Sequence, residues 1–567
     1  MLRKASGLFF ILFSATSSFV FGQQTLELQH QWEVDPPLGN IWDPTRSSRS
    51  ILFDIELLKS RFTKDRLQVA QSISLEHNNP KFQQRERTLD LLITGLKSGE
   101  ENLLVKRAMV AATLSLGDGS HADVLWSLAK SDAALLPAVE RKLVEWKSPI
   151  ALTEWRKRLG DPKAKPTELA TALEGLAVVG NGDDRLALQD VIFASHTSVA
   201  NKYLAACALG GLVTKGLNEI AKQVMESDLD QRYLIASQLI KLHTGEETAT
   251  QMRRILAEGP ASAQLVAYRS VSQEFPEIAR EFAKPMTLHS DPGLRSLALQ
   301  FLQQYSDQEC LEMQGALLND RNPGVRSLVA KHLLEKARQG HRAQVDKFVV
   351  SHLNAAEWTG IEKAIVVAVG LEDRSHCKAF LRLLEHPRPE VSVIAGWALK
   401  EIGDEPEILA DMLGQAERMT AELNSTTKIS LISLTDRIWL SYLHEAFGKY
   451  HHEPASQMLM TYIPKTGHQF GKITRASAIW SLGKLNTGKD NKILREKLHD
   501  RIGDLPPVNP EDYLVRFTCN LALGEMAHPE SREVIVRYHE QLPSPLAYAA
   551  DWALSQIDKA SAVKPLE

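Results

Sequence analysis

The densest group of side chains that could bind a metal ion lies in the last quarter of the chain. His444-Glu445 is followed by His451-His452-Glu453, and neutral imidazoles are the commonest metal ligands in proteins. On one continuous helix, His444, His451 and His452 would share a face. However, the stretch contains no HExxH pattern, and Pro454 predicts that the helix ends here. We expect solvated or capping histidines and predict neither a metal nor a cofactor, although the sequence leaves metal binding by these three histidines open.

Three other stretches match a functional motif only in part. Asn181-Gly-Asp183-Asp184 lacks the alternating ligands and distal glutamate of a calcium loop, so it predicts a turn with an Asp N-cap. Gly467-His-Gln-Phe-Gly471-Lys472 is one residue short of a phosphate loop and follows no strand. Asn424-Ser-Thr426 is a glycosylation sequon, relevant only in a eukaryotic secretory pathway. No GxSxG or comparable nucleophile motif occurs, so the sequence predicts no catalytic residue and no enzyme activity.

Two groups of three tryptophans are relevant here. Those that recur near the ends of predicted helices, a regularity that favours packing between repeats, are Trp397, Trp480 and Trp552. Those without such a pattern, which are candidates for exposed aromatic side chains, are Trp126, Trp146 and Trp155. Two of the second group, Trp146 and Trp155, would be the contact residues if the chain recognised glycans.

The elements that must position these residues are repeated helices. Asp291-Pro292-Gly-Leu-Arg295-Ser296-Leu297 returns 31 residues later as Asn322-Pro323-Gly-Val-Arg326-Ser327-Leu328. Asp and Asn are good N-cap residues, and proline is tolerated at the first helical position because no amide donor is needed there. Each copy therefore predicts a helix start, and a fixed period of this length indicates stacked helical repeats.

The repeat can be followed by an apolar anchor in the second half of one helix per repeat. The anchors are Leu173, Leu209, Leu239, Val271, Leu302, Leu333, Val369, Leu399, Phe447, Leu482, Leu523 and Leu554. The residue four positions before each anchor is also apolar, which builds a stripe along one helix face. These helices are therefore expected to bury that stripe against their neighbours.

Arginine recurs seven positions before the anchor. The arginines at this offset are Arg232, Arg295, Arg326, Arg475 and Arg516, with Arg107 before Leu114 in an earlier helix. Proline recurs ten positions before it, at Pro292, Pro323 and Pro389. One turn into a helix, an arginine can reach the carbonyl groups of the preceding loop or an aspartate. We therefore expect the arginines to form a ladder between repeats.

These features resemble HEAT repeats, in which an Asp/Asn-Pro-x-x-Arg helix start is followed by an Ala-Leu-Gly-like helix end. The ends stand here as Cys207-Ala-Leu-Gly210, Trp397-Ala-Leu-Lys-Glu-Ile-Gly403, Trp480-Ser-Leu-Gly483, Leu521-Ala-Leu-Gly524 and Trp552-Ala-Leu-Ser555. The resemblance, which includes the bacterial phycobilin-lyase-like variety, is good over residues 165–560 and weak over residues 50–165. It implies a scaffold with a long binding surface, since HEAT arrays typically act in that way.

We accordingly predict an all-α, right-handed α-solenoid of about 12–14 HEAT-like helix pairs. The predicted organisation is a signal peptide (1–22), an extended leader or N-terminal cap (23–47), degenerate helical repeats (48–164), the HEAT-like array (165–560) and a C-terminal tail (561–567). The tryptophans of the leader are expected to cover the open face of the first repeat, because the end of a solenoid must be protected.

The first residues predict export from the cytoplasm. Arg3 and Lys4 precede an apolar stretch that ends at Val20-Phe21-Gly22, which places signal-peptide cleavage before Gln23. The remaining chain would carry 64 basic against 70 acidic residues, and this mild acidity argues against nucleic acid as a partner. The cysteines, Cys207, Cys310, Cys377 and Cys519, are too sparse for a disulfide scaffold, so small buried hydrophobic residues are expected.

The resulting functional hypothesis is an exported, non-catalytic scaffold, periplasmic or extracellular, that binds a protein partner of the cell envelope on its concave surface. An alternative is a HEAT-type enzyme or cofactor-handling protein, either a metal hydroxylase or a chromophore lyase. Di-iron hydroxylases built on HEAT repeats carry recurring His-Glu pairs, whereas no other repeat here copies His444-Glu445. A second alternative is a module that recognises envelope glycans. The sequence leaves the partner, the partner-binding residues and the oligomeric state open.

Overall fold

The computed structural model describes residues 30–38, 54–76, 84–100, 102–425, 434–465, 470–540 and 544–563. Every regular element within these ranges is helical, and none is a strand. The predicted all-α class is confirmed. The predicted signal peptide, the Gly467-His-Gln part of the glycine-rich stretch and Thr426 of the sequon lie outside the described residues. Within them, no helix is both long and apolar enough to cross a bilayer.

The chain divides into two compact units, one of residues 44–345 and one of residues 1–43 with 346–567. The helices of the first unit are α2 (Thr63–Glu76), α3 (Arg85–Lys97), α4 (Leu103–Leu116), α5 (Ala122–Ser131), α6 (Leu136–Glu145), α7 (Leu152–Leu159), α8 (Pro166–Val179), α9 (Arg185–Phe193), α10 (Val199–Leu212), α11 (Asn218–Glu226), α12 (Arg232–Ile240), α13 (Glu246–Glu258), α14 (Ala261–Glu274), α15 (Pro276–Thr287), α16 (Pro292–Leu302), α17 (Gln308–Ala316) and α18 (Pro323–Lys336), preceded by the 3-10 helix η2 (Ile55–Lys59).

The boundary between the units falls within α19 (Arg342–Leu353). The helices of the second unit are α1 (Gln31–Val34), α20 (Trp358–Gly370), α21 (Cys377–Leu383), α22 (Pro389–Ile402), α23 (Pro406–Ser425), α24 (Leu434–Lys449), α25 (Ser456–Met460), α26 (Lys472–Leu485), α27 (Lys492–Gly503), α28 (Tyr513–Met526), α29 (Ser531–Arg537) and α30 (Pro545–Val563). The predicted domain boundaries stay predictions, and α30 runs past the predicted start of the tail.

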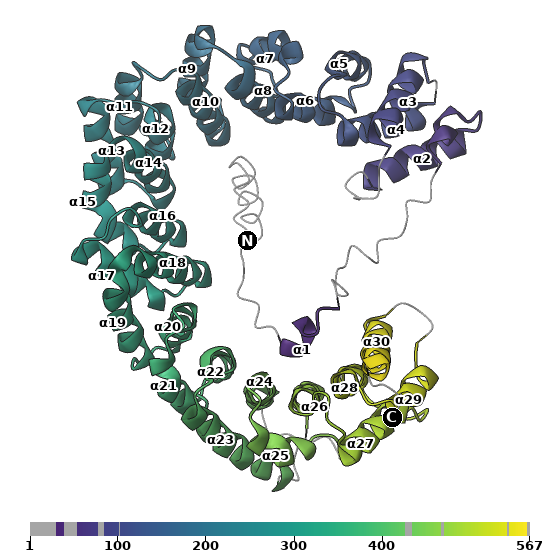
Figure 1. The fold of residues 1–567 in the computed structure, drawn as a ribbon. Helices are drawn as coiled ribbons and strands as arrows, with labels where there is room; N and C mark the ends of the chain where they lie inside the picture. Colours follow the sequence, from purple (N-terminus) through teal and green to yellow (C-terminus); the bar gives the residue numbers. More distant parts are fainter. Residues whose placement is uncertain are drawn as a thin grey trace. The chain divides into compact units, whose positions relative to one another are not determined.

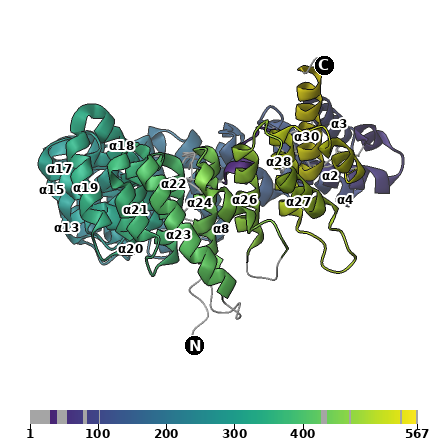
Figure 2. The ribbon, with the colours of Figure 1, turned by 60° about the horizontal axis from the view of Figure 1, so that its bottom comes forward.

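Each unit is a stack of antiparallel helix pairs in two layers. In residues 44–345 the even-numbered helices from α8 to α18 pack side by side, and in the second unit those from α20 to α30 do the same (Figure 1). The odd-numbered helices form the second layer, and Figure 2 shows α22, α24, α26 and α28 in register along one row. We call the even-numbered helices from α8 to α30 the even row. The arrangement confirms the predicted solenoid of HEAT-like pairs.

The helix starts form as the sequence predicts. Asp291 accepts hydrogen bonds from the backbone N–H groups of Gly293 (2.7 Å) and Leu294 (3.1 Å), and Pro292 is the first residue of α16. Asn322 caps α18 in the same way, with Pro323 at its first position. Each cap satisfies donors that the first turn of a helix leaves free.

All twelve predicted anchors fall on even-row helices, from Leu173 on α8 to Leu554 on α30. Ten are buried, whereas Val369 and Leu554 are partly exposed. The even row therefore carries the apolar stripe, and it packs this stripe against the odd layer and against the next helix of its own row.

The arginine ladder also exists. Arg295 pairs with Asp320 at 2.5 and 2.7 Å and donates to the carbonyl groups of His289 and Ser290. Arg475 binds Glu511 in the same bidentate way and donates to two carbonyl groups of the preceding loop. Both partner carboxylates lie in the loop that leads into the next even-row helix. Each arginine therefore connects consecutive repeats.

The glycines of the Ala-Leu-Gly-like ends allow neighbouring even-row helices to approach closely. A Cβ on Gly210 of α10 would lie 2.0 Å from the carbonyl oxygen of Gln238 on α12. On Gly483 of α26 it would lie 2.6 Å from the Cα of Ala522 on α28. Any side chain at these positions would push the row apart, which is the physical reason for glycine there.

Candidate functional site

A short peptide from the N-terminal part of the chain lies on the face of the even row that is turned away from the odd layer. This N-terminal segment, residues 30–38, contains α1 and contacts α24, α26 and α28 (Figure 1). The contacted residues, which we call the docking face, are Tyr442 and Glu445 of α24, Ser477, Trp480 and Lys484 of α26, and Phe517 of α28.

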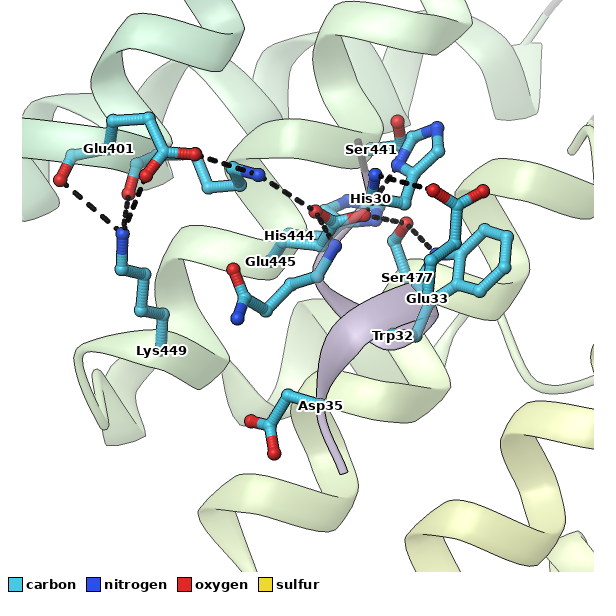
Figure 3. A network of polar contacts seen from close by, with 12 residues as sticks. His30, Trp32, Glu33, Asp35, Glu401, Ser441, His444, Glu445, Lys449 and Ser477 are labelled. Atoms are coloured by element: carbon cyan, nitrogen blue, oxygen red, sulfur yellow. Dashed lines mark hydrogen bonds and ion pairs between the residues drawn. The ribbon is translucent and has the colours of Figure 1, made fainter. Parts of the chain in front are cut away.

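Glu445 stands at the centre of the docking face and is fully buried. Its Oε1 atom is hydrogen bonded to Nδ1 of His30 at 2.6 Å and accepts from the Ser477 hydroxyl at 2.7 Å. Its Oε2 atom accepts from the backbone N–H of Gln31 at 2.9 Å (Figure 3). Two of these three partners belong to the N-terminal segment, so the segment supplies most of the hydrogen bonding of a buried carboxylate.

Close packing of α24 and α26 brings Ser477 within reach of Glu445. Gly448 of α24 faces Ser481 of α26, where an added Cβ would lie 2.7 Å from the Ser481 Cα atom. The Ser481 hydroxyl donates to the carbonyl oxygen of His444 at 2.6 Å. Ser477 lies one turn earlier on α26, where the same small interface lets its hydroxyl reach the carboxylate.

The charge of Glu445 is balanced from α22. The Lys400 ammonium lies 3.9 Å from Glu445 Oε2 and 3.0 Å from a carboxylate oxygen of Glu401, which also pairs with Lys449 at 3.1 Å. Burial raises the pKa of the Glu401 carboxyl, but Lys400 and Lys449 outweigh it and hold the pKa below its usual value. Glu445 therefore sits in a network with compensating charges rather than beside an isolated ion.

The aromatic side chains of the segment fill an apolar seat beside Glu445. The His30 ring stacks on Trp32 (5.2 Å between centroids) and on Tyr442 (4.9 Å), and Trp32 meets the ring of Phe517 edge-on at 6.4 Å. Trp32 is 5% exposed and belongs to a buried cluster with Trp480, Phe517, Ala476, Leu521, Leu546 and Ala549. Its indole N–H donates to the Ser477 hydroxyl at 3.3 Å, which extends the network to Glu445.

The second half of the segment is held by Trp480 and Lys484. The Trp480 indole donates to the Asp35 carbonyl oxygen at 2.9 Å, and the Lys484 ammonium pairs with the Asp35 carboxylate at 2.8 Å. Lys484 also pairs with Glu525 of α28 at 2.8 Å. Burial lowers the pKa of Lys484, but these two carboxylates outweigh it and raise the pKa above its ordinary value. Lys484 is thus a firmly charged contact for an acidic residue.

The structure separates the histidines that the sequence placed together. α24 ends at Lys449, His451 has a positive φ of 51°, and His452 precedes a new 3-10 turn. Among the described residues no group of three or more His, Cys, Asp or Glu side chains is arranged to hold a metal ion. The shared helical face does not form, because the chain turns between His444 and His451.

The expectation of a solvated or capping histidine is wrong for His444. It is fully buried, its Nδ1 lies 3.3 Å from the Thr474 carbonyl oxygen, and its ring stands edge-on to Tyr462 at 4.5 Å. Burial lowers the pKa of His444 to about 3. His444 is a neutral histidine of the helix interface, and it makes none of the contacts of its neighbour Glu445.

The other polar candidates have structural roles. In the described residues around Asn181, a 3-10 turn (Gly182–Asp184) forms as expected, but Asn181 rather than an aspartate caps it. The Asp184 carboxylate forms an ion pair with the Arg156 guanidinium, with Oδ1 and Nε 2.7 Å apart. Three of the cysteines are buried and Cys207 is partly exposed, and none is in a disulfide. Burial raises the pKa of Cys310 to about 11 and of Cys377 to about 12.

The tryptophans without a repeat position are not exposed, which corrects the sequence-based expectation. Trp155 is fully buried and donates to Glu140, Trp126 is 7% exposed, and Trp146 is partly covered beside Gly117 and Gly119. Of the two residues named for glycan contact, Trp155 is buried, whereas Trp146 stays partly exposed. By contrast, Trp552 packs against Gly524 of the neighbouring helix, in agreement with packing between repeats.

The predicted position of the leader tryptophans is wrong for Trp32, whereas Trp42, the other leader tryptophan, lies outside the described residues. Trp32 lies on α26 and α28, among the last repeats, rather than on the first repeat. Sequence order does not say which repeats a leader contacts. The sequence analysis noted Glu445 as half of a metal pair and Trp480 as packing, and it missed their joint contact with residues 30–38. The only sequence signal was an acidic residue at a buried helical position.

No protein-family profile and no curated protein matches the chain. Importin beta is similar over 89% of this chain and 72% of its own, with 12% identity and a TM-score of 0.46. The karyopherin Kap121p, in a structure bound to the SUMO protease Ulp1p, is similar over 88% of this chain, with 11% identity and a TM-score of 0.47. The chain spans 57% of the length of that Kap121p chain.

The repeat class follows from the helices themselves. Capped Pro-x-x-Arg starts occur at α16 and α18 of the first unit, and even-row anchors, glycines at helix crossings and arginines that bridge repeats recur through both units. The chain is an α-solenoid of HEAT-like repeats.

Proposed function

We propose that the chain is a non-catalytic scaffold that binds a short peptide segment of a protein partner on the even-row face of its second unit. The observation that supports this is the docking face itself, which holds residues 30–38 through one buried carboxylate, one hydroxyl, one indole N–H and one ammonium group. These groups contact both the backbone and the side chains of the bound segment. Binding sites for short peptides commonly combine the two kinds of contact.

The apolar seat beside Glu445 gives this face an anchor of the kind that dominates binding energies. A tryptophan buried among Trp480, Phe517 and small side chains is fully desolvated, and its N–H still finds a partner in Ser477. Buried aromatic anchors of this sort carry most of the affinity in protein interfaces. The partner is therefore expected to present an aromatic residue close to a hydrogen-bond donor and an acidic residue.

A selection experiment tests this function. Random peptides displayed on phage are selected on the full chain carrying Trp32→Ala, which removes the anchor of the resident segment. We expect tryptophan-containing peptides that lose binding on Glu445→Gln. The matched control is Glu453→Gln, which changes an exposed glutamate just beyond α24 that pairs with Lys489. Absence of any enriched peptide, or equal binding to both glutamine variants, contradicts peptide recognition at this face.

We further infer that the protein is exported and that its partner belongs to the cell envelope or the extracellular space. The support is the sequence of residues 1–22, with Arg3 and Lys4 ahead of an apolar stretch and small residues before Gln23. Intact-mass analysis of the protein recovered from outside the cytoplasm should give Gln23 as the first residue. A cytoplasmic product that begins at Met1 would contradict export.

A further inference from the structure

Several buried groups of the docking face depend on residues 30–38 for their hydrogen-bond partners or their cover. Glu445 has no exposed surface, and His30 and Gln31 provide two of its three hydrogen-bond partners. If the segment left without replacement, the Glu445 carboxylate would lose these two partners, and water would have to take their place. Trp480, at 2% exposure, and Phe517, at 1%, would lose the cover of the Trp32 ring. An empty face is therefore unfavourable.

The occupant itself is only loosely integrated. Within residues 30–38, Val34 is 46% exposed, Glu33 and Pro37 are exposed, and the helix α1 is only four residues long. The segment makes no strand or long helix of its own, and its contacts are concentrated at His30, Trp32 and Asp35. This is the pattern of a short linear ligand held by anchors, rather than that of a structural repeat.

The segment is also remote in sequence from its seat. His30 and Glu445 are separated by 415 residues, and Trp480 and Asp35 by 445. A tethered ligand of this kind competes with a free one at a high effective concentration, typically in the millimolar range for a flexible tether. A partner segment can then bind only the molecules in which the docking face is vacant. Its apparent dissociation constant is therefore its intrinsic dissociation constant divided by the vacant fraction.

We propose that residues 30–38 are a competitor built into the chain, which occupies the docking face until a partner segment of the same chemistry displaces it. That chemistry is a hydrogen-bond donor pair for Glu445, a tryptophan for the seat on Trp480 and Phe517, and an acidic residue for Lys484 three positions after the tryptophan. The proposal rests on the proposed function, because it assigns regulation to the same face.

The test uses the full chain and a synthetic peptide of sequence His-Gln-Trp-Glu-Val-Asp-Pro-Pro-Leu, labelled with a fluorophore at its C-terminus. Binding is measured by fluorescence anisotropy to the wild type, to Trp32→Ala and to His30→Ala, each checked for native helix content by circular dichroism. We expect binding at least tenfold tighter to Trp32→Ala than to the wild type. Val34→Ala, an exposed change in the same segment, is the matched control and should bind like the wild type.

The outcomes separate the two proposals. Adding Glu445→Gln to Trp32→Ala should abolish binding, and a peptide with alanine in place of tryptophan should not bind. Equal affinity for the wild type, Trp32→Ala and His30→Ala overturns the competitor and leaves peptide docking intact. No binding to any variant overturns peptide docking itself. The wild type could also form a concentration-dependent dimer that Trp32→Ala abolishes. Residues 30–38 of one molecule would then occupy the docking face of another, and this result would overturn competition within one chain.

Discussion

Many of the buried ionic side chains among the described residues lie in ion pairs, and two of them, Asp320 and Glu445, differ in where their partners come from. In residues 44–345, Arg295 and Asp320 form a bidentate pair within a ladder of repeats, with both side chains about 5% exposed or less. In the second unit, Glu445 obtains its partners from the N-terminal segment, from α26 and from α22. Because an unpaired buried charge is costly, removal of one partner is expected to matter more than the worth of the pair suggests.

The ladder gives a first prediction. Arg295→Ala should lower the free energy of unfolding by about 3–5 kcal/mol, because it leaves the Asp320 carboxylate buried and unpaired. Arg253→Ala is the matched control, since its pair with Glu281 has both side chains about half exposed and should contribute less than about 1 kcal/mol. Urea denaturation followed by circular dichroism measures both. A similar decrease in the free energy of unfolding in the two variants would show that the buried pair stabilises the fold no more than an exposed pair does.

The buried histidine gives a prediction about pH. The pKa of His444 is about 3 in the folded protein because of burial, and 6.5 in the unfolded chain. The unfolded state therefore takes up a proton below pH 6.5 while the folded state does not, and stability falls as the pH drops toward 3. The slope reaches about 1.4 kcal/mol per pH unit. His444→Gln should lose less stability than the wild type between about pH 7 and pH 5, measured by urea midpoints.

His332 of α18 supplies a comparison for this measurement. Burial lowers the pKa of His332 to about 4, and His332 lies in the unit of residues 44–345. His332→Gln should therefore also reduce the loss of stability between pH 7 and pH 5. A profile in His444→Gln that is parallel to the wild type down to pH 5 would mean that His444 is protonated in the folded protein.

At the scale of helices, the spacing of the even row depends on residues without side chains. Gly210, Gly448, Gly483 and Gly524 each lie where an added Cβ would come within 3 Å of the neighbouring even-row helix. The close approach does two things. It packs neighbouring even-row helices against each other, and between α24 and α26 it brings the Ser477 hydroxyl to the carboxylate of Glu445. The docking face is thus a consequence of helix crossing distance.

Two adjacent glycines of α10 test this dependence. Gly210→Ala should cost about 1–3 kcal/mol of stability, because the new methyl group overlaps the backbone of α12. Gly211 has open space around its Cβ position, so Gly211→Ala should be neutral or stabilise by up to about 1 kcal/mol through helix propensity. Thermal melts of the two variants, compared with the wild type, give the result. A stabilising Gly210→Ala would refute the close crossing.

At the scale of the whole molecule, the N-terminal segment belongs to the unit formed by residues 346–567. Its contacts join α24, α26 and α28, so it acts as a further packing element for that unit. The unit of residues 44–345 has its own core and does not contain this contact. Loss of the segment should therefore be felt in one unit.

Hydrogen exchange measures this directly. In Trp32→Ala, backbone amides of α26 and α28 should exchange several-fold faster, because the cover over Trp480 and Phe517 is removed and local opening becomes easier. Amides of α14 in the other unit should be unchanged, and so should all amides in Val34→Ala. Uniformly faster exchange in both units would indicate general destabilisation instead of loss of a local contact.

Features that depend on neighbours along the chain could be predicted from their pattern. The Asp291 and Asn322 caps, the anchors of the even row and the arginine offsets follow from helical geometry within one repeat, so they were predictable and are confirmed. The tertiary structure alone decided what depends on distant segments. His444 is buried, Trp155 is covered and Trp32 seats on Trp480, because packing between elements fixes exposure.

The contact between His30 and Glu445 marks this division most clearly. Each residue has an unremarkable local context, and no periodic pattern connects positions 415 residues apart. Similar helices recur along the array, so the pattern within one repeat does not say which repeat the leader contacts. The contact forms where the Glu445 carboxylate, the Ser477 hydroxyl and the rings of Trp480 and Phe517 lie together, and only the folded stack brings those groups to one site.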